Sequence, residues 1–329
     1  WLVLPVCLGF LSKSDFEMKV MKTIIRCVAA SAIIALLHAF SSCQFKASRQ
    51  VQVKPPVVQA HRGGAAEYPE NTIPAMLHAV SMGVPVLEMD LHVTRDHQVV
   101  VSHDPFLNSK KILKPDGGQI AVVEERNYAI YSMTYDSLKR YDAGSRSNPQ
   151  YSGRKQMSCH IPLVSELIDS VEAYTAAHRL APVAYNIEIK SWPDKDGIYT
   201  PDYRTFADLC MKVLLDKQLG NRLVVQCFDA RTLNYLHEHY PQVILSYLIE
   251  PEDGVDFDMQ MKRLSFVPPV ISPHYQMVDE KFIRQAKKNG NQIIPWTVDD
   301  REEVKRLTLL GVDAIITNRP SCVLQWLGY

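Results

Sequence analysis

The sequence predicts a parallel α/β fold in which eight strands close into a barrel. Short apolar segments alternate with segments of helical periodicity from about residue 57 to residue 327. With one hairpin arm set aside, the segments that read as strands number eight, and a helix follows nearly all of them. Such alternation favours parallel strands, and eight units favour a closed barrel over an open sheet. The 329 residues are 47% hydrophobic, so the chain can bury one large core.

The expected strands are short runs of apolar and β-branched residues bounded by turn-forming ones. The hairpin arm follows the second strand through a tight turn, and antiparallel pairing there would bring His103 beside Asp90. Residues 104–160 are the least regular part, and we expect them to form a small insertion over one end of the barrel. The expected strands cover residues 57–61, 86–92, 183–190, 222–227, 243–248, 269–273, 292–297 and 313–317, with the hairpin arm at 99–101.

The expected helices carry apolar residues at helical spacing and lie between most of the strands. The first follows the segment Pro69-Glu70-Asn71-Thr72, with Asn71 or Thr72 as its N-cap, and runs to Gly83. A weaker helical pattern occupies residues 251–263. The other helices are expected at residues 134–141, 163–178, 203–217, 230–239, 279–289, 300–310 and 321–327.

Residues 1–42 are expected to be upstream residues and a signal peptide rather than part of the fold. Lys22 and Arg26 precede an apolar stretch, residues 27–40, that is too short for an ordinary membrane span. The chain begins with Trp1, and we expect the true start at Met18 or Met21.

The small residues directly before Cys43 resemble a bacterial lipoprotein signal, in which that cysteine becomes the lipidated first residue. The resemblance implies export to the bacterial cell envelope, the periplasm or the outer membrane, with a lipid anchor at Cys43. An ordinary cleaved signal and an uncleaved anchor are the alternatives. Residues 43–56 are polar and end in two prolines, which suits a tether, so the barrel domain is expected to span residues 57–329.

Charge and cysteine content argue against several classes of function. The 36 basic and 36 acidic residues give zero net charge without a sustained basic run, which argues against a nucleic-acid-binding surface. The 7 cysteines show neither CxxC spacing nor regular pairing, which argues against a disulfide framework and a zinc knuckle. We expect Cys159, Cys210, Cys227 and Cys322 to be structural or free thiols.

The segment from Ala60 to Asp104 concentrates residues that could hold a divalent cation against a phosphate. Alternation along the second strand places Glu88 and Asp90 on one face, so both carboxylates can reach one cation. Oxygen ligands of this kind suit Mg²⁺ or Ca²⁺. Glu188 and Lys190 repeat the same spacing on another strand, where Glu188 would be the third carboxylate and Lys190 could hold a phosphate oxygen.

Polar residues gather late in the strands, and the ends of the strands form the functional face of a parallel barrel. A Glu-x-Asp motif that stands alone on a strand usually lies on a solvent-exposed face, and a lone His-Arg-Gly is weak evidence of a functional site. Several strands that deliver charge to one rim are hard to explain by stability, because a buried carboxylate is costly without a cation. These strand-end residues are His61, Glu88, Asp90, Glu188, Lys190, Gln226, Phe228 and Trp296.

The motifs are His61-Arg62-Gly63, Pro69-Glu70-Asn71-Thr72, Glu88-x-Asp90, His103-Asp104, Glu188-x-Lys190, Gln226-x-Phe228 and Trp296-Thr297-Val298, and the longer segments 134–144, 161–167 and 311–320. Together they closely resemble the glycerophosphodiester phosphodiesterase family, over about residues 57–327. Cys227 departs from the serine usual in the family, and strand alternation should point its side chain away from Gln226 and Phe228.

The resemblance implies a TIM-type (β/α)8 barrel that hydrolyses glycerophosphodiesters to glycerol 3-phosphate and an alcohol, with one divalent metal, Mg²⁺ or Ca²⁺. We expect Glu88, Asp90 and Glu188 to bind the metal. His61 and His103 would be the acid–base pair, because an imidazole pKa of about 6.5 populates both forms near neutrality. The residues expected to contact the substrate are Arg62, Lys190, Gln226, Phe228 and Trp296.

Two other functions compete with this hypothesis. A phosphatidylinositol-specific phospholipase C-like enzyme would also use a histidine pair, but the bacterial ones generally lack the three carboxylates. A catalytically inactive barrel that serves as a tethered binding module would show erosion of the site, and Glu88, Asp90 and Glu188 are all present. The preferred alcohol and the oligomeric state are left open.

Overall fold

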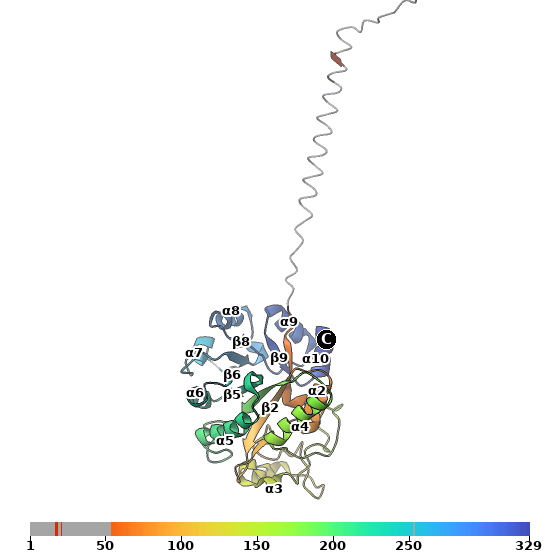
Figure 1. Cartoon of the computed structure of the whole chain (residues 1–329), viewed down its shortest axis with the longest axis vertical. Coiled ribbons are helices and arrows are strands. Elements are labelled where there is room, and N and C mark those ends of the chain that lie inside the picture. The colour runs from red at the N-terminus through yellow and green to blue at the C-terminus, as the bar shows by residue number, and fades with distance from the viewer. Residues whose placement is uncertain (1–16, 19–20, 22–53, 253) are drawn as a thin grey trace, which may run out of the picture. The chain divides into compact units, whose positions relative to one another are not determined.

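Eight parallel strands lie at the centre of the computed structural model, with helices around them (Figure 1). Neighbouring strands pair in the order β8-β7-β6-β5-β4-β2-β1-β9. The predicted barrel is therefore confirmed. The strands are β1 (Val57–Ala60), β2 (Val86–Val93), β4 (Ala184–Ile189), β5 (Leu223–Cys227), β6 (Ile244–Ile249), β7 (Val270–Pro273), β8 (Gln292–Ile293) and β9 (Ala314–Thr317).

The seam between β8 and β9 is closed by separate backbone hydrogen bonds instead of a regular ladder. The amide of Asp313 donates to the carbonyl of Ile293, and the amide of Ile316 donates to the carbonyl of Pro295, both at 3.0 Å. The sequence predicts a strand over residues 292–297, but β8 ends at Ile293. Pro295 has no amide hydrogen to donate, which explains why the regular pairing stops early.

The structure describes residues 17–18, 21, 54–252 and 254–329. The chain divides into a segment Trp1–Gln52 and a unit Val53–Tyr329. The predicted lipidation site, Cys43, and nearly all of the predicted signal and tether lie outside the described residues. Among those described, no helix combines the length and apolar character needed to cross a membrane.

The helices pack their apolar faces against the outside of the strands, with Met76, Leu167 and Phe206 fully buried in the shared core. Thr72, and not Asn71, is the N-cap of the first barrel helix, because its hydroxyl accepts the amide of Ala75. The barrel helices are α2 (Ile73–Ser81), α4 (Val164–Ala177), α5 (Tyr203–Asp216), α6 (Ala230–His239), α7 (Phe257–Met261), α8 (Glu280–Lys288), α9 (Arg301–Leu310) and α10 (Pro320–Leu327).

The predicted hairpin is present, and it leads the chain out of the barrel. The strand β3 (Val99–Val101) pairs antiparallel with β2, with Leu91 opposite Val101. The amide of Ser102 then donates to the carbonyl of Asp90 at 2.9 Å. Because β3 leaves the barrel, β2 pairs directly with β4, and the residue after Ser102 lies beside Asp90 as predicted.

The predicted insertion lies between β3 and α4, and it folds on a small apolar core of its own. Its helical turns are η2 (Val122–Tyr128), η3 (Ile130–Ser132) and α3 (Tyr135–Leu138). Ile130 and Leu138 are fully buried in this core. The core also includes Val100, Leu107, Ile112, Ile120, Ala143 and Ile161.

We expect Leu138→Ala to lower the free energy of unfolding by about 2–5 kcal/mol, because it leaves a cavity in the insertion core. Val123→Ala is the matched control, since Val123 is 92% exposed in the same insertion, and it should change stability by less than about 0.5 kcal/mol. Urea unfolding of both variants measures the difference. Equal midpoints for the two variants would contradict a packed insertion core.

Candidate active site

The turn that follows β1 brings His61 and Arg62 over the end of the barrel. The sequence predicts His61 as the last strand residue, but the strand ends at Ala60 and His61 begins a 3₁₀ turn, η1 (His61–Gly63). Arg62 has a φ of 53° and Gly63 a φ of 80°. A Cβ atom at Gly63 would lie 2.8 Å from the Cβ atom of Ala75, so only glycine lets this turn pack against α2.

Glu88, Asp90 and Glu188 form the carboxylate cluster that strand alternation predicts. Glu88 and Asp90 lie two residues apart on β2, and Asp90 is the register partner of Glu188 on β4. One oxygen of each side chain lies within 4.8 Å of the other two. The three residues are 1%, 1% and 6% exposed. A cluster so deeply buried requires positive charge nearby.

Arg62 and Lys190 supply part of that charge. The Nε atom of Arg62 lies 3.3 Å from an Asp90 oxygen, and the Nζ atom of Lys190 lies 2.9 Å from a Glu188 oxygen. The amide of Asn71 donates to Asp90 at 2.8 Å. Burial alone would raise the pKa of Asp90, but the charges of Arg62 and Lys190 outweigh it and hold that pKa below its usual range.

The other two carboxylates remain incompletely compensated. Burial, together with the charge of Asp90, raises the pKa of Glu88 well above its usual range. Burial also raises the pKa of Glu188 to about 7, although Lys190 opposes the shift. A divalent cation among the three oxygens would supply the missing charge, and the all-oxygen donor set fits Mg²⁺ or Ca²⁺. The carboxylate cluster therefore fits a hard divalent metal.

His61 is held in one tautomer by a residue from the far end of the chain. Its Nδ1 atom lies 2.7 Å from Oδ1 of Asn318, and Nδ2 of Asn318 donates to Asp299 at 2.8 Å. This orientation of the amide makes Nδ1 of His61 the donor and leaves Nε2 free of hydrogen, 3.9 Å from Glu88. Burial and the charge of Arg62 lower the pKa of His61 to about 3, so its imidazole is neutral.

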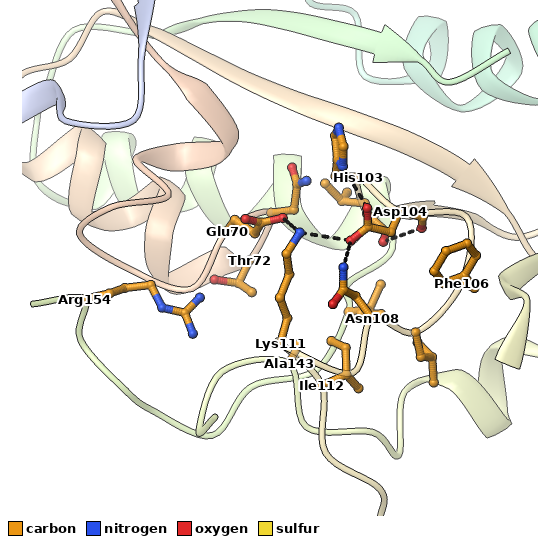
Figure 2. Close-up of a pocket in the computed structure, with 15 residues that line it drawn as sticks. Glu70, Thr72, His103, Asp104, Phe106, Asn108, Lys111, Ile112, Ala143 and Arg154 are labelled. Carbon is orange, nitrogen blue, oxygen red and sulfur yellow. Dashed lines mark hydrogen bonds and ion pairs between the residues drawn. The ribbon is translucent and has the colours of Figure 1, made fainter. Parts of the chain in front are cut away.

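His103 lines one pocket together with His61 and has its own carboxylate partner. Figure 2 shows its ring against Asp104, with Nδ1 3.1 Å from Oδ1 of the carboxylate. Because a carboxylate only accepts, Nδ1 of His103 carries the hydrogen and Nε2 is the free nitrogen. Burial, and then the charge of Arg62, lower the pKa of His103.

One central pocket collects nearly all of the predicted site residues. Asp90 is the exception, since it is buried and does not line the pocket. Phe228 and Trp296 meet edge to face with ring centroids 5.4 Å apart, and Trp192, which the sequence analysis missed, stacks on Phe228 at 5.2 Å. The lining residues are His61, Arg62, Glu88, His103, Glu188, Lys190, Gln226, Phe228, Leu248, Trp296, Thr297 and Ile316.

Gln226 lines the central pocket, and its side chain is hydrogen-bonded to the carboxylate cluster. Its amide donates to Glu88 at 2.9 Å, and its carbonyl oxygen accepts from Asn186 at 3.0 Å. Its contact with substrate remains a prediction, whereas its bond to Glu88 is a clear positioning role. Cys227 points away from the pocket as predicted, since its thiol is buried and donates to the carbonyl of Ile189. The predicted free thiols are found at Cys159, Cys210, Cys227 and Cys322.

Several residues that hold the site in place were not predicted as functional. Asn71 and Asn318 belong to motifs noted in the sequence, so a signal for both was available. Their partners are 19 and 257 positions away in the chain, and spacing alone cannot reveal such contacts. Lys111 lies in the irregular insertion, where no motif marks it.

The arrangement can be compared with known proteins. The model of the glycerophosphoryl diester phosphodiesterase family matches residues 61–322. The chain belongs to this family. It is a phosphoric diester hydrolase, as its motifs predict. A glycerophosphodiester phosphodiesterase of Caldanaerobacter subterraneus is 25% identical over 269 residues, which cover 82% of this chain and 96% of that protein.

Solved structures share the barrel. A structure from Silicibacter pomeroyi has a TM-score of 0.73 at 23% identity and covers 83% of this chain and 93% of its own. An Oleispira antarctica phosphodiesterase was solved in complex with the product sn-glycerol-3-phosphate. Its structure has a TM-score of 0.66 at 20% identity, and the match covers 84% of this chain and 98% of that one. At these identities the likeness shows the fold alone, and it agrees with the TIM-type barrel predicted.

Proposed function

We propose that the chain hydrolyses glycerophosphodiesters to glycerol 3-phosphate and an alcohol with the help of one divalent metal, Mg²⁺ or Ca²⁺. The observation that carries the proposal is the buried carboxylate cluster, which shares one pocket with His61 and His103. The product complex of the Oleispira antarctica phosphodiesterase, which has the same fold, supports this class of substrate.

Glu88, Asp90 and Glu188 would hold the metal. When bound, the metal would supply positive charge that polarises the phosphoryl oxygens. Arg62 and Lys190 border the same pocket and neutralise the charge that builds up on those oxygens in the transition state. Gln226 keeps Glu88 in place through its 2.9 Å hydrogen bond.

His61 and His103 would move the protons. Each carries its hydrogen on Nδ1 and keeps Nε2 free, so either ring can accept a proton from an attacking hydroxyl group. The attacker in this scheme is the glycerol hydroxyl next to the phosphate. One histidine starts the cycle neutral and takes its proton. The other starts the cycle with a proton from solvent on Nε2 and gives that proton to the leaving alkoxide.

A cyclic phosphate is the product of that first step, and water opens it in the second. The histidine roles reverse, because the ring that gave up its proton now takes one from water, and the other returns its proton to the glycerol oxygen. Each ring therefore ends the cycle as it began. Phe228 and Trp296 offer apolar ring surfaces against which the glycerol carbons would pack.

Removing the metal with a chelator is expected to abolish phosphodiester hydrolysis, and adding Mg²⁺ or Ca²⁺ should restore it. Glu188→Gln should weaken metal binding at least about tenfold, because one charged ligand is lost. Calorimetric titration of stripped protein with each metal measures this independently of activity. Glu280→Gln, whose side chain is 80% exposed on α8, is the control. Unchanged metal affinity in the Glu188 variant would refute the ligand set.

His103→Ala is expected to lower kcat about 10²- to 10⁴-fold, because one partner in proton transfer is lost. Metal affinity should remain nearly unchanged, since His103 is not among the proposed ligands. His178→Ala, at an exposed histidine after α4, is the control. Glycerol 3-phosphate release from a panel of glycerophosphodiesters measures the effect. Full activity in the His103 variant would remove it from the mechanism.

We also propose that the protein is exported and anchored in the bacterial cell envelope through a lipid on Cys43. The support is the sequence alone: a basic region, a short apolar stretch and small residues before the cysteine. In a bacterial host, labelled fatty acid should enter the full chain and should be absent from Cys43→Ser. Equal labelling of the two proteins, or none in either, would contradict the anchor.

A further inference from the structure

We propose that Lys111, a residue of the insertion, positions His103 for proton transfer by holding the carboxylate of Asp104. The inference rests on the proposed role of His103 and adds a residue that does not touch the reacting atoms. Figure 2 shows the Lys111 side chain reaching up from the insertion between Glu70 and Asp104. Its Nζ atom lies 2.9 Å from Oδ2 of Asp104 and 2.8 Å from Oε1 of Glu70.

The two oxygens of Asp104 have separate tasks. Oδ1 accepts the hydrogen on Nδ1 of His103 at 3.1 Å. Oδ2 accepts from Lys111 and, at 2.9 Å, from the side-chain amide of Asn108. With two donors on Oδ2, the carboxylate plane is fixed and Oδ1 stays directed at the ring. This keeps the hydrogen on Nδ1 and leaves Nε2 free to face the central pocket.

Lys111 also joins His103 to the other side of the site. Glu70, its second partner, accepts from Arg62 at 3.2 Å, and Arg62 reaches Asp90 of the carboxylate cluster. The side chains of Lys111 and Glu70 are only 19% and 11% exposed, so these ion pairs are little weakened by salt. Acidic and basic side chains therefore alternate from the carboxylate cluster to His103, in the order Asp90, Arg62, Glu70, Lys111 and Asp104.

The fold of the insertion determines where this ammonium group lies. The amides of Lys111 and Ile112 both donate to the carbonyl of Asn108 at 3.0 Å, which closes a turn after Asp104. Ile112 is 7% exposed and packs in the insertion core. Lys111 is therefore anchored on one side by that core and on the other by the carboxylates of Asp104 and Glu70, of which Glu70 belongs to the barrel.

The charged groups that act on His103 are Arg62, Asp90, Asp104 and Lys190, and the neutral imidazole of His61 lies nearby. Among the described residues, no hydrogen bond or ion pair joins Lys111 to the ring, and Asp104 bonds to both of them. Arg62 and Lys190 line the central pocket, whereas Lys111 lines an adjoining pocket that shares His61, Arg62 and His103 with it. A substitution of Lys111 should consequently affect turnover more than binding of substrate or metal.

Lys111→Met removes the charge and keeps the length of the side chain. We expect kcat to fall about ten- to a hundredfold, because Asp104 and the His103 ring lose their fixed orientation. KM and the metal affinity measured by calorimetry should stay within about twofold, as expected for a residue that contacts neither ligand. Lys111→Arg should recover part of the loss, since it restores the charge. Lys139→Met, on the exposed lysine that follows α3, is the matched control and should leave activity unchanged.

A double-mutant cycle with Asp104→Asn decides whether Lys111 acts through Asp104. If it does, Lys111→Met should lower kcat by less than about twofold in the Asp104→Asn background. Full additivity of the two effects would overturn the inference and leave Lys111 as a structural residue. Lys111→Gln serves in the same cycle if the Met variant does not fold. Full activity of His103→Ala would instead defeat the proposed function, so the two failures are distinguishable.

Discussion

The burial of three carboxylates on two adjacent strands is the constraint on which the rest of the site depends. Glu88 and Asp90 share one face of β2, and the register places Glu188 next to Asp90. This adjacency exists only because β3 turns out of the barrel and lets β2 pair with β4. Each carboxylate loses its hydration, and that loss must be offset by charge and hydrogen bonds from the surrounding chain.

Several buried polar side chains inside the barrel form hydrogen bonds that support these carboxylates. The amide of Asn186 donates to both Gln59 and Gln226, and Gln226 in turn donates to Glu88. Four strands, β1, β2, β4 and β5, thus contribute to a hydrogen-bonded network where a stable barrel would carry apolar side chains. Glu88 is held at both oxygens, by the side-chain amide of Gln226 and the backbone amide of Arg62, whereas Oδ1 of Asn186 has no hydrogen-bond partner among the described residues. Stability is lost at this end of the barrel in exchange for a preorganised site.

Sequence reasoning reached the elements that local periodicity controls. Alternation along β2 and β4 was enough to place Glu88, Asp90 and Glu188 together, and the hairpin register was enough to bring in His103. It failed where a contact depends on distant parts of the chain. Asn318 orients His61 from 257 residues away, and no spacing rule connects them. The early end of the seventh expected strand was predictable, because Pro295 has no backbone amide hydrogen to donate and its position is visible in the sequence.

The position of Lys111 in the insertion could not be predicted from the sequence either. The segment lacks periodicity because it folds around a few scattered apolar residues, such as Ile112 and Leu138, and so its polar side chains cannot be placed in advance. The ammonium group of Lys111 lies between two partly buried carboxylates, Glu70 and Asp104, and compensates the charge of both. Without Lys111, Glu70 would keep its ion pair with Arg62, but Asp104 would lose its lysine partner, and breaking a buried pair in this way costs more than the pair itself contributes. The insertion and the barrel are therefore joined electrostatically at the place where the proton is proposed to move.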